Sequence, residues 1–123
     1  YDKHAYRSVE HAYQAQKSTD PAVREAIRCS PSAAAAKKLS RGVFLRSDWE
    51  TFKIPLMCEL LRLKFAQEPE KSILLSTGDE ELVEGNWWHD TFWGQCPLGV
   101  GRNQLGQLLM QVRDEIRSEL QLM

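Results

Sequence analysis

The stretch on which the fold depends is Asn86-Trp87-Trp88-His89-Asp90-Thr91-Phe92-Trp93-Gly94, which holds three of the four tryptophans of the chain. Tryptophan buries a large apolar surface and carries one N–H group that needs an acceptor. A cluster of tryptophans mixed with Asp, His and Asn therefore forms either the wall of a pocket or the corner of a dense core. The residues of the stretch alone leave both interpretations open.

The residues on both sides of this stretch predict a short strand, a loop and a long last helix. An acidic and apolar piece at residues 81–84 favours a strand. Gly94, Gly99 and Gly101 mark a loop, and Asn103 is placed to cap the helix that follows. Apolar side chains then recur at spacings of three and four, so one face of this helix is core; they are Leu105, Leu108, Leu109, Val112 and Ile116.

Three helices are predicted in the first third of the chain from their capping residues. The first begins after Ser8 as its N-cap and runs to about Lys17. The next two begin where a capping residue precedes a proline, and they cover about 21–29 and 31–40; the pairs are Asp20-Pro21 and Ser30-Pro31.

Two prolines punctuate the middle of the chain. Ser47 and Glu50 have capping-box spacing, and Pro55 either kinks the helix that follows or starts a second one that runs to about Gln67. The pair Glu68-Pro69 opens a further helix through about residue 75. We therefore expect a single α+β domain over residues 1–123, predominantly helical and with a small β-sheet.

Composition bounds the class of protein. The hydrophobic content of 42% and the charged content of 27% are those of a soluble globular protein, and the net charge of −1 gives no general reason for tight binding to nucleic acid or membrane. The charges are unevenly spread, because six basic residues lie between Arg24 and Arg46 against one acid, Glu25. This segment is either a basic face that meets phosphate or a solvated helix surface.

The three cysteines predict a reduced protein. Cys29, Cys58 and Cys96 are odd in number and far apart, which favours a cytoplasmic location. No segment has the roughly 18 apolar residues that span a bilayer, and no signal peptide is visible, so no membrane partner is expected. The histidines are scattered and no cysteine pair has zinc spacing, so we expect neither a metal nor another cofactor.

Carboxylates, a lysine and tryptophans remain as the chemistry of the chain. Glu10, Gln14 and Lys17 project from one face of the first predicted helix, which is either solvated or part of a site. Glu10 and Asp90 suit a reaction in which positive charge develops at a sugar carbon. A desolvated Lys17 amine can attack such a carbon and form a Schiff base, while Trp49, Trp88 and Trp93 can stack on a heteroaromatic base.

Five blocks of sequence resemble the NADAR family, also called the YbiA-like N-glycosidases. They occur in family order over nearly the whole chain, and together they are highly specific. The blocks are Ser8-Val9-Glu10-His11-Ala12-Tyr13-Gln14-Ala15-Gln16-Lys17, Asp48-Trp49-Glu50, Leu75-x-Thr77-Gly78-Asp79-x-Glu81-Leu82-Val83-Glu84, Asp90-x-x-Trp93-Gly94 and Asn103-x-Leu105-Gly106-x-Leu108-Leu109-Met110-x-Val112-Arg113.

The resemblance implies a hydrolase that cleaves the N-glycosidic bond between ribose and a nitrogenous base. The implied substrates are ADP-ribosylated guanine in nucleic acid or ribosylated early intermediates of riboflavin synthesis. It places the functional residues at Glu10, Trp49, Asp90 and Trp93, with Lys17 as the Schiff-base amine in the ADP-ribosyl branch. The alternative is a non-catalytic module that binds ADP-ribose or a nucleotide.

The full set of predicted site residues has two parts. Glu10, Lys17 and Asp90 are the expected catalytic residues, in a pocket between the first helix and the 86–94 stretch. The expected substrate-binding residues include aromatic walls, phosphate contacts and a helix N-terminus that offers backbone donors; they are Trp49, Trp88, Trp93, Gly94, Arg41, Arg46 and Asn103.

The chain also departs from the family pattern at its N-terminus. Family members usually begin with an extra strand and a loop of Ser-Asn-Phe type that helps to form the base pocket, whereas this sequence starts after that segment. We therefore expect the N-terminal strand of the family to be missing from residues 1–123.

Overall fold

The structure is a computed structural model, which describes residues 1–85, 90, 92–95, 99 and 101–122. These residues are predominantly helical, as predicted, and they form two compact units, Tyr1–Leu63 and Lys64–Met123. No helix within these ranges is long and apolar enough to cross a membrane. The prediction of a single domain stays a prediction.

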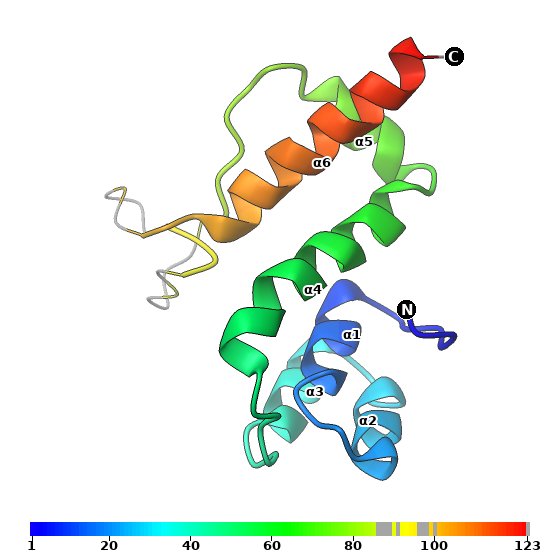
Figure 1. Cartoon of the computed structure of the whole chain (residues 1–123), viewed down its shortest axis with the longest axis vertical. Coiled ribbons are helices and arrows are strands. Elements are labelled where there is room, and N and C mark those ends of the chain that lie inside the picture. Colours follow the sequence, from blue (N-terminus) through cyan, green and yellow to red (C-terminus); the bar gives the residue numbers. More distant parts are fainter. Residues whose placement is uncertain (86–89, 91, 96–98, 100, 123) are drawn as a thin grey trace. The chain divides into compact units, whose positions relative to one another are not determined.

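The first unit is built on three short helices that lie side by side (Figure 1). They are α1 (Val9–Ala15), α2 (Pro21–Arg28) and α3 (Ala33–Ser40). Their shared core consists of Ala15, Ile27 and Ala36, none of which is more than 1% exposed. The two alanines let the helix backbones approach closely, and Ile27 fills the space between them.

The predicted caps hold for α1 and α2 and fail for α3. Ser8 Oγ accepts from the His11 N–H at 3.1 Å, and Asp20 Oδ1 accepts from the Ala22 N–H at 2.9 Å. The predicted cap at Ser30 is wrong, because Ser32 caps α3. Ser30 is buried and donates its hydroxyl to the Ile27 carbonyl at 2.7 Å, so it closes the end of α2 instead.

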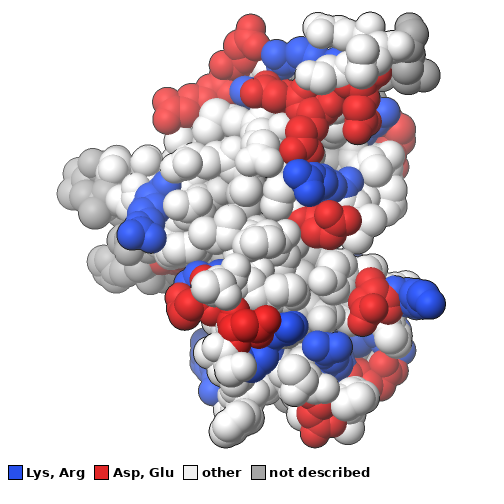
Figure 2. All heavy atoms as spheres, viewed as in Figure 1, with Lys and Arg blue, Asp and Glu red and all other residues white. Residues whose placement is uncertain are grey.

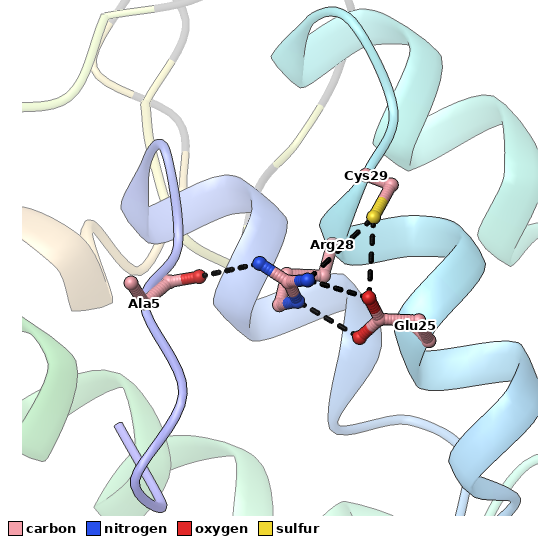
Figure 3. A network of polar contacts seen from close by, with 4 residues as sticks. All are labelled: Ala5, Glu25, Arg28 and Cys29. Carbon is pink, nitrogen blue, oxygen red and sulfur yellow. Dashed lines mark hydrogen bonds and ion pairs between the residues drawn. The ribbon is translucent and has the colours of Figure 1, made fainter.

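An arginine at the end of α2 fastens the N-terminal segment. Arg28 Nη1 donates to the carbonyl of Ala5, and its Nε donates to Glu25 Oε2 at 2.8 Å (Figure 3). The Cys29 thiol also lies 3.3 Å from Glu25 Oε1. The hydrogen bond from Arg28 is the main reason why the pKa of Glu25 falls to about 2.

The fourth helix continues through Pro55. α4 (Trp49–Phe65) is one helix with Pro55 inside it, so this proline does not start a second helix. Its buried side chains include Trp49 near the N-terminus and Leu56 and Leu60 further along.

The second unit contains α5 (Glu70–Ser76) and α6 (Gln104–Gln121), which pack on each other (Figure 1). Arg113 of α6 donates from Nη1 to Thr77 Oγ1 and to the Glu80 carbonyl, both at 2.8 Å. One turn further, Arg117 donates to Asp79 Oδ1 at 2.8 Å. These contacts fix the turn after α5 to the last helix.

The described residues contain no strand, so the predicted small β-sheet is not confirmed. Gly85 and Gln95 form a single parallel bridge, in which the Gln95 N–H donates to the Glu84 carbonyl at 2.8 Å. The extended piece that the sequence predicts at residues 81–84 has its backbone groups bound in another way, described below.

The two units carry opposite net charge. Residues 1–63 contain 11 Lys and Arg against 7 Asp and Glu, which gives +4, whereas residues 64–123 contain 5 against 10, which gives −5. Figure 2 shows acidic side chains gathered over α6 and the segment that follows α5, where Asp79, Glu80 and Glu81 are exposed. A phosphate-bearing ligand is therefore attracted to the first unit.

Candidate functional site

Lys17 lies beside two aromatic rings in the first unit. Its Nζ is 5.7 Å from the ring centroid of Tyr13 and 5.8 Å from that of Trp49. The two rings meet edge to face with their centroids 5.1 Å apart, and both are buried. α1 places Tyr13 one turn before Lys17, while Trp49 comes from the start of α4, so tertiary packing completes this aromatic corner.

The environment of Lys17 makes its amine easier to deprotonate. Burial lowers the pKa of Lys17 from its ordinary value and is the largest influence on it. The Glu10 carboxylate opposes this shift, while the positive charges of Lys37 and Lys53 add to it. A larger neutral fraction is what an amine needs in order to act as a nucleophile.

Glu10 is held by a chain of side chains that reaches α3. Gln14 Nε2 donates to Glu10 Oε1 at 2.7 Å, and the Ser40 hydroxyl donates to Gln14 Oε1 at 2.6 Å. Gln14 and Ser40 are both buried, at 3% and 6% exposed. The sequence predicts that Glu10, Gln14 and Lys17 share one helix face. Glu10 and Gln14 lie together on α1, whereas α1 ends at Ala15 and Lys17 follows its C-cap, so a face shared by all three stays a prediction.

The two predicted phosphate-binding arginines occupy different positions. The Arg46 N–H donates to the Lys17 carbonyl at 2.8 Å, and the Arg46 guanidinium lies 3.9 Å from the centroid of the Phe52 ring and pairs with Asp48. Arg41 is exposed at the C-cap of α3, directly after Ser40. Arg46 is thus tied to the Lys17 corner by its backbone, while Arg41 extends into solvent.

In the second unit, Asp90 organises a tight turn. Its Oδ1 accepts from the N–H groups of Phe92 at 3.2 Å and Trp93 at 2.9 Å, and its carbonyl accepts from the Gly94 N–H at 3.3 Å. The rings of Phe92 and Trp93 meet edge to face at 4.8 Å. The carboxylate of Asp90 therefore sets the backbone from which the Trp93 side chain projects.

The start of α6 is bound to this turn by its backbone. The N–H of Asn103 donates to the Gly94 carbonyl at 3.3 Å, and the next two amides, of Gln104 and Leu105, donate at 3.0 Å to the carbonyls of residues 92 and 93. We predicted a phosphate site from free backbone N–H groups at this helix N-terminus. The N–H groups of residues 103–105 instead donate to carbonyl oxygens of the Asp90 turn.

The Asn103 side chain does not cap its own helix, contrary to the sequence prediction. Its Oδ1 accepts from the Glu84 N–H at 2.8 Å, and its Nδ2 donates to the Leu82 carbonyl at 2.9 Å. Asn103 is 4% exposed and has a positive φ of 50°. It joins residues 82–84 to the Asp90 turn.

The candidate residues thus fall into two groups, each described within its own unit. Glu10, Lys17 and Trp49 form the first group, and Arg46 is tied to it. Asp90, Trp93, Gly94 and Asn103 form the second. Trp88 lies outside the described residues. The predicted pocket between the two groups stays a prediction.

Several residues around this first group were not predicted as site residues from the sequence. Tyr13 is four residues before Lys17, so helical spacing alone was a sufficient signal for it. Ser40 is 26 residues from Gln14, and no local pattern links the two. Phe52 contacts Trp49 one turn earlier on α4, so helical spacing was a signal for it as well. Lys53 acts on Lys17 only through tertiary packing.

Comparison with known proteins identifies the family. The NADAR domain matches residues 1–117. N-glycosidase YbiA of Escherichia coli is 40% identical over 121 residues, which cover 96% of this chain and 75% of that protein. An N-glycosidase of Nostoc punctiforme is 42% identical and covers 95% and 78%, respectively.

Two further matches extend this comparison. A riboflavin biosynthesis protein of Vibrio vulnificus is 42% identical over 113 residues, which cover 89% of this chain and 30% of that protein. The NMR structure of E. coli YbiA superposes with a TM-score of 0.83 at 38% identity, over 93% of this chain and 69% of that one. The chain therefore belongs to the NADAR domain family.

Proposed function

We propose that this chain is an N-glycosidase, a hydrolase that cleaves the bond between ribose and a nitrogenous base. The names of its relatives support this activity. The observation that carries it is a partly desolvated Lys17 amine beside Trp49, close enough to Glu10 for this carboxylate to act on its pKa. Gln14 holds the Glu10 carboxylate in place. A nucleophile, a carboxylate and an aromatic wall are what cleavage of a ribosyl–base bond requires.

In the proposed reaction, the Lys17 amine attacks the ribose carbon that bears the base. The carbon–nitrogen bond to the base breaks, and the base leaves with one proton. The sugar ring then opens to a Schiff base on Lys17, and water hydrolyses it to free the sugar and restore the amine. Glu10 and Asp90 stabilise the positive charge that develops at the ribose carbon.

The remaining residues bind the substrate in this proposal. Trp49, Trp88 and Trp93 hold the base or the sugar, and the Gly94 turn and Asn103 support that wall. Arg41 and Arg46 contact phosphate, which the net charge of +4 on residues 1–63 favours. The free thiols of Cys29 and Cys58 fit a cytoplasmic enzyme.

Two substrate classes follow from this assignment. One is ADP-ribosylated guanine in a nucleic acid, and the other is a ribosylated aminopyrimidine phosphate of early riboflavin synthesis. The name of the Vibrio vulnificus relative supports the second class. Both present a ribose carbon bonded to nitrogen and at least one phosphate.

The test is release of free base from each substrate, measured by chromatography. We expect release from at least one of them, and Glu10→Gln should reduce it about 100-fold or more while the far-UV circular dichroism stays unchanged. Tight binding of either substrate without release would contradict the enzyme and favour the ADP-ribose or nucleotide-binding module.

The role of Lys17 is tested by trapping with borohydride. Mass spectrometry of the wild-type protein during turnover should show added sugar mass on the peptide that contains Lys17. Lys17→Arg keeps the charge and should abolish both trapping and turnover, whereas Lys38→Arg, at an exposed position of α3, should change neither. An unmodified Lys17 during active turnover would rule out the Schiff base.

A further inference from the structure

Gln14 has its two amide ends bound to different partners. Its Nε2 lies 2.7 Å from Glu10 Oε1, and its Oε1 lies 2.6 Å from the Ser40 hydroxyl. Ser40 Oγ is also 2.8 Å from the carbonyl of Lys37, at the end of the same helix. These distances connect the Glu10 carboxylate on α1 to the last turn of α3 through buried groups.

The direction of the hydrogen bonds in this chain is fixed by its ends. An ionised carboxylate can only accept, so the amide nitrogen of Gln14 must face Glu10. The amide oxygen then faces Ser40, and an amide oxygen can only accept as well. If the Ser40 proton pointed to the Lys37 carbonyl, two oxygen lone pairs would meet at 2.6 Å, so Ser40 must donate to Gln14.

The two oxygens of Glu10 are therefore unequal. Oε1 accepts from Gln14, while among the described residues no hydrogen-bond donor to Oε2 is found. An oxygen that already accepts a hydrogen bond from a buried amide has fewer lone pairs left for a ligand, so the other oxygen is the one that can contact a substrate. The charged groups that act on the neighbouring Lys17 amine are Glu10 of α1, Lys37 of α3 and Lys53 of α4.

We propose that Gln14 and Ser40 are positioning residues that hold Oε1 of Glu10 and leave Oε2 to face the substrate. This inference rests on the proposed function only for the identity of the substrate. It assigns the buried polar residues of α1 and α3 a task that a purely structural hydrogen bond would not have. Ser40 donates to the amide oxygen of Gln14, which keeps the amide nitrogen of Gln14 directed at Glu10.

The protein contains a matched control residue for both Gln14 and Ser40. Gln16 is a buried glutamine on the same helical segment, but its amide donates to the Tyr6 hydroxyl at 3.2 Å. Ser30 is a buried serine whose hydroxyl donates to a backbone carbonyl at 2.7 Å, at the end of α2. Gln14→Met is therefore compared with Gln16→Met, and Ser40→Ala with Ser30→Ala.

The experiment measures kcat and KM for the four variants. We expect Gln14→Met and Ser40→Ala to lower kcat about tenfold, with KM within about twofold. Gln16→Met and Ser30→Ala should lower the melting temperature and leave both kinetic constants in place. Equal kcat and KM for a variant and its control would overturn the proposal.

A second measurement separates this proposal from the proposed function. The carboxyl ¹³C resonance of Glu10 is measured at one neutral pH without substrate, in the wild type, in Gln14→Met and in Gln16→Met. A resonance that moves in Gln14→Met and stays in place in Gln16→Met supports the hydrogen bonds from Ser40 through Gln14 to Glu10, even if the wild type releases no base. The opposite result is an active wild type, an inactive Glu10→Gln and an unchanged Glu10 resonance in Gln14→Met. It would refute the positioning role of Gln14 and leave the proposed enzymatic activity standing.

Discussion

Replacement of Asn103 tests how the second unit holds the Asp90 turn. The Asn103 side chain is 4% exposed and binds both the Glu84 N–H and the Leu82 carbonyl, so Asn103→Ala leaves two part-buried backbone groups without these partners. Each such loss destabilises by about 1–3 kcal/mol. Alanine at φ 50° adds about 1 kcal/mol, because its Cβ disfavours the left-handed conformation. Because both contacts are only part-buried, the lower half of the first range applies, about 1–2 kcal/mol for each backbone group, and we expect a total loss of about 3–5 kcal/mol.

Two further variants separate the contributions at this position. Asn103→Gly loses the same hydrogen bonds but adopts the left-handed conformation without strain, so it should be less destabilising than Asn103→Ala by about 1 kcal/mol. Asn103→Asp keeps an acceptor for the Glu84 N–H but places a carboxylate against the Leu82 carbonyl. It should therefore destabilise more at neutral pH than at a pH where the new carboxyl is protonated.

The assay for Asn103 is urea unfolding followed by far-UV circular dichroism, combined with amide exchange at Glu84. The exchange of this amide should accelerate in all three variants, because its acceptor is lost or altered. A loss of less than about 1 kcal/mol in Asn103→Ala would refute the assigned contacts. A glycine variant that is no more stable than the alanine variant would refute the contribution of the backbone conformation.

Two more predictions concern Gly106 and Lys17. A Cβ on Gly106 would lie 2.1 Å from the Leu82 carbonyl oxygen, so Gly106→Ala should destabilise by about 1–3 kcal/mol in urea unfolding. Gly42→Ala, where nothing lies within 4 Å, should differ little from the wild type. The pKa of Lys17 is lowered on folding, so the unfolded chain binds more protons just below the ordinary value of 10.5. The free energy of unfolding of the wild type should therefore rise with pH in that interval, relative to Lys17→Met, and a constant difference would contradict the shift.

Local patterns predicted the parts of the fold that local physics determines. Ser8 and Asp20 cap their helices as expected, because a capping side chain bonds to amides two or three residues away. The same reasoning failed at Ser30, whose carbonyl accepts from His11 Nε2, 19 residues distant, at 3.1 Å. A hydrogen bond to a residue far away in the sequence leaves no pattern in the residues next to Ser30.

The expected strand at residues 81–84 shows a second kind of limit. A strand in a sheet exchanges its N–H and C=O groups with a neighbouring backbone, and here the side-chain amide of Asn103 takes that place for Leu82 and Glu84. The pattern of residues indicated extended backbone, but it did not reveal whether a strand or a side chain supplies the partners. Asn103 itself reads as a helix cap, since that is its usual local role.

The candidate site was predictable where one helix carries it. Glu10 lies on α1 and Lys17 directly follows the C-cap of that helix, and this short separation in sequence lets the carboxylate act on the pKa of Lys17. The corner that lowers the pKa of Lys17 also needs Trp49 from α4 and the positive charges of Lys37 and Lys53, which only tertiary structure brings together.

Glu10 has two proposed roles, one on the pKa of Lys17 and one at the ribose, and an experiment can separate them. The carboxylate raises the pKa of Lys17, against burial and the two neighbouring lysines. Removal of its charge in Glu10→Gln therefore increases the fraction of neutral amine. If the only task of Glu10 were to tune Lys17, the variant would trap borohydride adducts at least as well as the wild type at neutral pH. A loss of turnover in Glu10→Gln consequently measures what the carboxylate does at the ribose itself.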